Sequence, residues 1–471
     1  MIQTINREHP EYMARKATWR RYRDLYVGGD QLRERGSEYL VRRQKEPGEV
    51  YQERLMRLFY QNYVGSIIDW YAATLMHREP VVQMEQPGGP ASGFYNTFFA
   101  DCDLKGTRLS QFFRERFTEM LVCGSSYVVV DFPRTAGRAA TRAEEDASGQ
   151  SRGFLVEYGA DEVINWNRDE RGGLEWVVIR SSCLQQSKVT DAKWEKETRW
   201  VYYDRESFRI YRKAGEQSPV ELVDEGRHCL APYGRVPVFE MKVSEGLWLM
   251  NKAALLQLEH FNKSNALSWA LTMGLFAMPV VYSDNEFKQV VGETYYLQLG
   301  QNDRFGWAEP DGKVYQIAAD NLDQLKDEIY RVCYLMTQAG DTSGTGARQS
   351  ALSKQLDFVA TEEVLRAYGA VVKETMTQVL GAVAEARQDG VTIDVTGLDD
   401  FDIDEFATEL NDVKSLLALG IGSETLTKQV FKRLALKYLS DARPEVKSRV
   451  VEEIEQTDYG KAGGTKDPAL Q

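Results

Sequence analysis

Few residues of this 471-residue sequence have a type and spacing that could catalyse a reaction. The four histidines, His9, His77, His228 and His260, do not pair at helical spacing, so no HExxH zinc site is available. The loop GTGARQ has Gln349 where the GxGxxG motif needs its last glycine, and neither GxxxxGK[ST] nor GxSxG occurs. The sequence therefore predicts a protein with no assembled active site and no cofactor.

One acidic run could bind a metal ion. The segment DDFDID, from Asp399 to Asp404, begins like a calcium loop, but counting from Asp400 places Glu405 where glycine is needed and Asn411 where glutamate is needed. We expect a solvated acidic turn. The alternative function is a nucleic-acid-processing enzyme with an unrecognised metal site in this run.

A small-residue loop, GDTSGTGARQ, combines hydroxyls, amides and isolated positive charges. Such groups suit transient contact with DNA phosphates, whereas a dense basic patch would hold DNA in place. The alternative is a plain mobile loop between two helices. The candidate DNA-contact residues are Thr342, Ser343, Thr345, Arg348, Gln349 and Lys354.

Charge and cysteine content limit the function class. Lys plus Arg is 58 and Asp plus Glu is 71, a net charge of -13, which is opposite to the sign typical of tight, sequence-specific DNA binding. The five cysteines are widely spaced and odd in number, which favours free thiols in a reducing compartment.

The uncharged segment 264–283 is long enough to cross a bilayer, but it contains Asn265, Thr272 and Pro279. We expect it to be buried between subunits and expect no membrane. A peripheral membrane oligomer anchored by this segment remains the third hypothesis.

These residues lie on a mixed α+β, mainly helical chain. Residues 10–46 are expected to be helical and polar, and the three-and-four spacing of apolar residues from Met56 to Leu75 predicts a helix over 53–77 with one buried face. Another helix is expected over 109–121, ended by Gly124, and YVVVD (127–131) is expected to form a buried strand. Residues 84–93 (MEQPGGPASG) are expected to form a loop. Short β segments, EWVVIR, RWVYYD and FRIYR, fall between 154 and 239.

The second half predicts a stalk. A helix over 249–273 leads into a small strand-rich module with VVYS, YYLQL and KVYQI, and a second helix returns from an N-cap at Asp320. A long helix over 350–389, a strand at VTIDV and helices near 405–419, 424–438 and 444–456 follow. Stalks bury little surface as monomers, so we expect this one to pack against copies of itself.

The order and spacing of these segments resemble the portal proteins of tailed bacteriophages. The resemblance covers roughly residues 53–455. It rests on four stretches: QNYVGSIIDWYAATLMHREP, RERFTEMLVCGSSYVVVDFP, RFGWAEPDGKVYQIAADNLDQLKDEIYRVCYLMTQAG and LALGIGSETLTKQV.

The resemblance implies the portal fold with wing, stem, clip and crown. The implied ranges are 1–245 for the wing body, 246–273 and 320–340 for the two stem helices, 274–319 for the clip, 341–352 for the tunnel loop, 353–399 for the long wing helix and strand, 400–457 for the crown and 458–471 for a disordered tail.

The resemblance also implies a non-enzymatic ring, usually of twelve identical subunits, at one capsid vertex of the virion, assembled in the host cytoplasm. Double-stranded viral DNA would pass through it without sequence preference. The implied protein partners are the terminase, the head-tail connector or adaptor, and the major capsid and scaffolding proteins.

Overall fold

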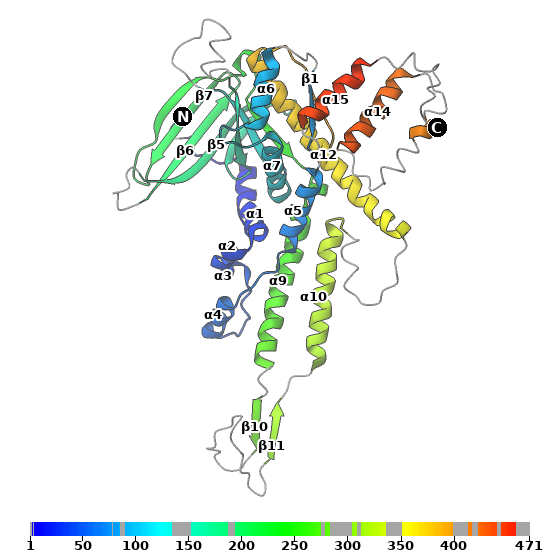
Figure 1. Cartoon of the computed structure of the whole chain (residues 1–471). Helices are drawn as coiled ribbons and strands as arrows, with labels where there is room; N and C mark the ends of the chain where they lie inside the picture. Colours follow the sequence, from blue (N-terminus) through cyan, green and yellow to red (C-terminus); the bar gives the residue numbers. More distant parts are fainter. Residues whose placement is uncertain are drawn as a thin grey trace. The chain divides into compact units, whose positions relative to one another are not determined.

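The computed structural model (Figure 1) describes residues 2, 4–77, 79–84, 90–133, 152–186, 194–274, 278–282, 304–308, 312–335, 351–398, 413–416, 423–439 and 444–457. They form two compact units. The first comprises Met1–Arg21, Ile68–Met250 and Gln355–Gln471, and the second comprises Tyr22–Ile67 and Asn251–Lys354. The mixed helix-and-sheet class agrees with the α+β prediction.

The helices are α1 (Pro10–Val27), α2 (Gly29–Glu34), α3 (Gly36–Tyr39), α4 (Gly48–Met56), α5 (Tyr63–Leu75), α6 (Pro90–Ala100), α7 (Leu109–Cys123), α9 (Leu249–Gly274), α10 (Gly312–Val332), α12 (Ala351–Arg387), α14 (Glu424–Tyr438) and α15 (Pro444–Gln456). The predicted helices over 249–273, 350–389, 424–438 and 444–456 are thus confirmed, and Ser423 caps α14 through its side chain as an N-cap should.

Within the described residues the strands form four antiparallel sheets. Their bounds are β1 (Val81–Met84), β2 (Ser125–Asp131), β3 (Phe154–Gly159), β4 (Val163–Arg168), β5 (Leu174–Gln185), β6 (Glu195–Asp204), β7 (Ser207–Ala214), β8 (Glu221–Arg227), β9 (Val238–Lys242), β10 (Met278–Tyr282), β11 (Arg304–Ala308) and β12 (Ile393–Thr396). In the first unit the orders are β3-β2-β9, β4-β5-β6-β7-β8 and β1-β12, and in the second β10 pairs with β11.

The core of the first unit joins two of these sheets. Alternate residues of β2, β4, β5, β6, β7 and β9 point into one apolar cluster, as the period of two in a strand requires. Where α7 ends, Gly124 adopts φ 85 and starts β2, which confirms the predicted helix–glycine–strand unit. The indole nitrogens of Trp19 and Trp248 donate to the last α7 carbonyls, those of Cys123 and Val122.

One predicted helix is wrong. Residues 53–77 do not form a single helix, because α4 ends at Met56 and α5 starts at Tyr63. The Asn62 side chain accepts a hydrogen bond from the Gly65 backbone, which makes it the N-cap of a new helix. Met56, assigned to the buried face, is exposed.

Three further boundaries differ. The predicted helix over 10–46 is broken at Gly28, which has φ 62, and the chain is non-helical between Leu40 and Pro47. The loop predicted over 84–93 is wrong from Pro90 onward, because α6 starts there. KVYQI, predicted as a strand, is helical, since α10 begins at Gly312 and not at Asp320. Its residues fit the same three-and-four spacing as Leu322 and Leu325.

Candidate functional site

The stalk of the second unit is an antiparallel helix pair. Lys252 of α9 donates from Nζ to the Tyr334 hydroxyl at 2.5 Å, Lys263 donates to Asn321 at 2.9 Å, and the Tyr315 hydroxyl donates to the Ala270 carbonyl at 3.4 Å. Residues further along α9 therefore contact residues further back in α10, as in any antiparallel helix pair. The paired stretch is about 27 Å long at 1.5 Å per residue.

Long side chains fill the space between the two helices. Tyr63, at the start of α5, packs edge-on against His260 of α9, with ring centroids 5.0 Å apart, and lies near Tyr330 of α10 at 6.3 Å. Ile329 and Cys333 are fully buried on the same side of α10. Beyond the ends of α9 and α10 the chain forms the β10–β11 ladder (Figure 1).

The segment 22–67 is bound along α9 by three amide side chains. Each amide bonds to backbone groups of the segment: Gln257 to Gln61 and Val64, Asn262 to Tyr39 and Val41, and Asn265 to both polar groups of Phe59. These contacts satisfy backbone groups of Val41, Phe59 and Gln61, which lie outside the helices, and terminal backbone groups of α3 and α5.

Replacing Asn265 with leucine is expected to lower the free energy of unfolding by about 1–3 kcal/mol, because both backbone groups of Phe59 lose their partner while partly buried. Urea denaturation measures the change. Ser268→Ala, on the exposed surface of the same helix, serves as the control and is expected to change stability by less than about 0.5 kcal/mol. Equal effects of the two variants would contradict the assignment.

Two charged networks hold the N-terminal residues in place. In the second unit, buried Asp24 accepts hydrogen bonds from Tyr39, Gln31 and Arg35. Burial alone would raise the pKa of Asp24, but these donors outweigh it, so the pKa lies below its ordinary value. The carboxylate is therefore charged at neutral pH and fixes the turn between α1 and α3.

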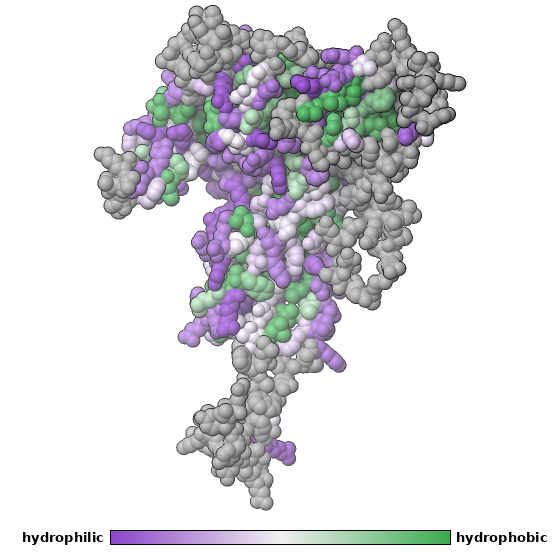
Figure 2. Space-filling model, viewed as in Figure 1, coloured by the Kyte–Doolittle hydropathy of each residue, from purple (hydrophilic) through white to green (hydrophobic). Residues whose placement is uncertain are grey.

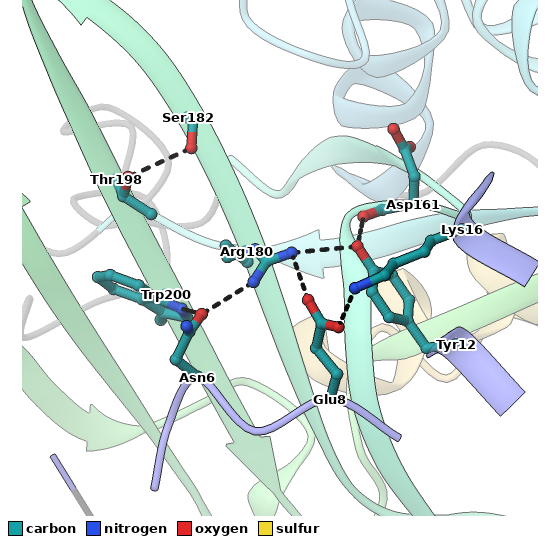
Figure 3. Close-up of polar contacts among 9 residues, drawn as sticks. All are labelled: Asn6, Glu8, Tyr12, Lys16, Asp161, Arg180, Ser182, Thr198 and Trp200. Carbon is teal, nitrogen blue, oxygen red and sulfur yellow. Dashed lines mark hydrogen bonds and ion pairs between the residues drawn. The ribbon is translucent and has the colours of Figure 1, made fainter. Parts of the chain in front are cut away.

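In the first unit, Figure 3 shows Arg180 of β5 at the centre of the other network. Its guanidinium donates to Asn6 at 2.8 Å, to Glu8 at 3.1 Å and to the Tyr12 hydroxyl at 3.1 Å, and Lys16 donates to Glu8 at 2.6 Å. The N-terminal residues thus cover one face of the five-stranded sheet. No role for residues 1–50 follows from the sequence alone, and these contacts give them a structural one.

Three large apolar side chains at one end of the helix pair are exposed to solvent. Leu271 of α9 is 42% exposed, and Val314 and Ile317 of α10 are 64% and 68% exposed. All three lie near the contact between Ala270 and Tyr315, so they surround the end of the pair that carries β10 and β11. Figure 2 shows apolar residues among hydrophilic ones over this part of the surface. These three exposed side chains are called the apolar belt.

Next to this belt lie a cavity and an acidic stripe. The cavity measures about 20 Å³ and is lined by Arg54, Arg57, Asn265, Ser268, Trp269 and Thr272. The acidic stripe is on the exposed face of α10 and consists of Asp320, Asp323 and Asp327. Sequence reasoning missed the cavity, because its residues come from segments about 200 positions apart.

Five of the six predicted DNA-contact residues lie outside the part of the chain that the structure describes. They are Thr342, Ser343, Thr345, Arg348 and Gln349. Lys354 lies in the first turn of α12, whose backbone alone is described there. The acidic run Asp399–Asp404 also lies outside the described residues, as do 132–153 apart from Phe132, Pro133 and the two residues 152 and 153.

Acid is expected to weaken the second unit through His260. Burial lowers the pKa of this imidazole below its ordinary value, and no acceptor or donor meets its Nδ1 among the described residues. The unfolded chain therefore takes up a proton first, and stability falls as the pH drops below about 6.5. Asp323 favours the charged form and Lys326 opposes it.

The thermal unfolding midpoint, measured from pH 7 to pH 5, tests this expectation. His260→Leu removes the titrating group, so its profile is expected to be flatter than that of the unmodified protein. His228, whose pKa burial also lowers, titrates in both proteins. Parallel profiles would contradict the role of His260.

Within the described residues, no group of three His, Cys, Asp or Glu side chains is arranged to hold a metal ion. Among the same residues, no helix has the length and apolarity needed to cross a membrane. All five cysteines lie in the described part of the chain, and none of them forms a disulfide there.

No protein-family model matches the sequence, and no curated protein matches it. Solved structures give weak likenesses. A chain from the neck of an empty GTA particle, computed with C6 symmetry, is 13% identical with a TM-score of 0.43, covering 76% of this chain and 86% of that one. A chain from the virion of a native gene transfer agent (GTA) particle is 12% identical with a TM-score of 0.39, covering 82% and 92%.

A chain from the neck of a native GTA particle, computed with C12 symmetry, is 11% identical with a TM-score of 0.36, covering 76% and 86%. These three TM-scores all lie below 0.5, so the likenesses do not assign a function to this chain.

Proposed function

We propose that this chain is a portal protein, which forms a ring at one capsid vertex through which viral DNA is packaged and ejected. The observation that carries the proposal is the α9–α10 pair with the β10–β11 ladder at its end and exposed apolar side chains on its flanks. A single copy leaves Leu271, Val314 and Ile317 in water, whereas neighbouring copies in a ring would cover them.

In this proposal α9 and α10 are the stem, with the second stem helix extended back to Gly312. Residues 274–311 are the clip, which docks the terminase and later the head-tail connector. Residues 1–245 and 353–399 form the wing, 400–457 form the crown inside the head, and 458–471 form a tail. The ring, of twelve subunits, contacts the major capsid and scaffolding proteins and resides in the virion after assembly in the host cytoplasm.

DNA passes through the tunnel without sequence-specific contacts and without a reaction catalysed by the ring. A net charge of -13 per copy repels phosphate, so the duplex can slide. Scattered donors from the 341–352 loop, with Lys354, make transient contacts.

Arg348→Ala and Lys354→Ala are expected to leave ring assembly intact and to lower DNA retention, because each removes one phosphate contact per copy. Packaged genome length in purified particles measures the effect. Arg227→Ala, which removes an exposed positive charge from β8, serves as the control. Unmodified genome content in both variants would remove these residues from the tunnel loop.

Mass photometry of purified protein tests the proposed function. A species near twelve times 53.7 kDa is expected. A stable monomer with metal-dependent nuclease activity would instead favour the enzyme with an acidic site in Asp399–Asp404, and co-flotation with liposomes would favour the membrane oligomer.

A further inference from the structure

The cavity beside α4 contains a donor with no partner. Arg54 is only 5% exposed, and its terminal NH1 donates to both oxygens of Glu46 at 2.9 Å. Its Nε is buried and meets no acceptor among the described residues. A buried N–H without an acceptor costs about 1–3 kcal/mol, so an oxygen atom is expected beside it.

The rest of the cavity also favours an anionic oxygen. Its lining includes two arginines, a serine hydroxyl and an indole, and no carboxylate. Arg57 lies over the Trp269 ring at 5.9 Å and pairs with Glu53 at the exposed rim, while Ser268 is exposed. A volume of about 20 Å³ admits one oxygen-sized group.

The cavity and α10 lie on opposite sides of α9. Lys263 and Ala270, which contact α10, are seven residues apart and share one face of α9. Asn265 follows Lys263 by two residues, which is about 200° further round a helix of 3.6 residues per turn. Figure 1 shows the same order, with α4 and α10 on either side of α9.

Asp320, the first residue of the acidic stripe, faces away from α9 on the other flank. Asp320 and Ile329 are nine residues apart, which places them on opposite faces of α10. Ile329 is fully buried, whereas Asp320 is exposed. The Asp320 carboxylate accepts from Gln316 at 2.7 Å and contacts no cation that the structure describes.

Asp320 and the cavity are at the same level. Lys263 contacts Asn321 and Ala270 contacts Tyr315, so 263–270 of α9 and 315–321 of α10 share one height. In a ring whose axis is parallel to the helices, each copy is related to the next by rotation about that axis. The cavity of one copy and Asp320 of the next therefore stay at the same height. A contact between two different flanks of identical subunits is the kind that closes a ring.

We propose that the cavity of one copy receives the Asp320 carboxylate of the neighbouring copy, with Arg54, Arg57 and Ser268 as its donors. The inference rests on the proposed ring and specifies one of its interfaces. The exposed Val314 and Ile317, on the same helix and within six residues of Asp320, would pack beside this ion pair.

Cysteine pairs test the contact directly. The test variant combines Cys183→Ser, Ser268→Cys and Asp320→Cys. After mild oxidation it is expected to run as a ladder of covalent oligomers on denaturing gels without reductant, and as a monomer once a thiol reductant is added. The control pair is Ser268→Cys with Asp327→Cys, because Asp327 lies about 10 Å further along α10. An equally strong ladder from the control pair, or none from the first pair in intact rings, would overturn the inference.

Charge exchange gives an independent test. Arg57→Asp and Asp320→Arg are each expected to lower ring yield about tenfold, while the double variant recovers it to within about twofold of the unmodified protein. Unchanged yields in both single variants mean that water alone fills the cavity, which overturns the inference. Normal rings with reduced DNA retention mean that phosphate fills it, which also overturns it. Absence of rings from the unmodified protein contradicts the proposed function itself.

Discussion

Leu271→Asp is expected to abolish ring formation while the single chain remains folded. Leu271 is 42% exposed in one copy, so the new carboxylate stays hydrated in the monomer. In the proposed ring the same position is covered by a neighbour, and an unpaired charge there costs several kcal/mol at each of the interfaces that a copy makes. Since about 1.4 kcal/mol changes an equilibrium tenfold, ring yield should fall by at least about tenfold.

Analytical ultracentrifugation measures the ring fraction, and circular dichroism checks the fold. Ile317→Asp, on the other helix of the pair, is expected to behave in the same way. Gln217→Asp adds the same charge at an exposed turn position of the first unit and should leave the ring fraction unchanged. Rings at the normal yield with both apolar positions charged would show that these flanks are not interfaces. Leu267 is a poorer test position, because it is half-buried within its own chain.

Gly369→Ala is expected to destabilise the first unit by about 3 kcal/mol or more. A Cβ at this position of α12 would overlap the carbonyl oxygen of Leu398, which follows β12. The obstacle is backbone, and Leu398 already has φ 64, so relief requires a shift of the chain after β12.

The same helix supplies a matched control. Gly381 has nothing within 4 Å of an added Cβ, so Gly381→Ala removes a flexible residue without a clash. It should raise stability by about 0.5–1 kcal/mol. Chemical denaturation of both variants measures the two changes in the free energy of unfolding. Equal and small effects would mean that the contact between Gly369 and Leu398 is absent in solution.

Local signals explain which elements could be predicted. The α7–Gly124–β2 unit is specified by a left-handed cap and a run of valines within a few residues. Long-range contacts explain the failures. The interruption between α4 and α5 is held by Asn265, about 200 residues away, and no periodicity in 53–77 reports it. KVYQI combines apolar positions that fit a strand and a helix equally, so packing on α9 decided its conformation.

The candidate site shows the same division. The stalk geometry follows from the order of its segments, whereas the cavity needs Arg54 and Trp269 from distant segments. One signal was present in the sequence: Gln257, Asn262 and Asn265 are three amides within nine residues of one helix. Polar residues at such positions indicate a chain segment bound there, and that segment is the N-terminal one.

Electron micrographs of the purified protein test the central claim most directly. We predict end-on class averages that show a closed ring with rotational symmetry and a central lumen wide enough for a DNA duplex, with the α9–α10 pairs side by side around it. Solitary particles without a lumen, at concentrations where the chain is folded, would contradict the account.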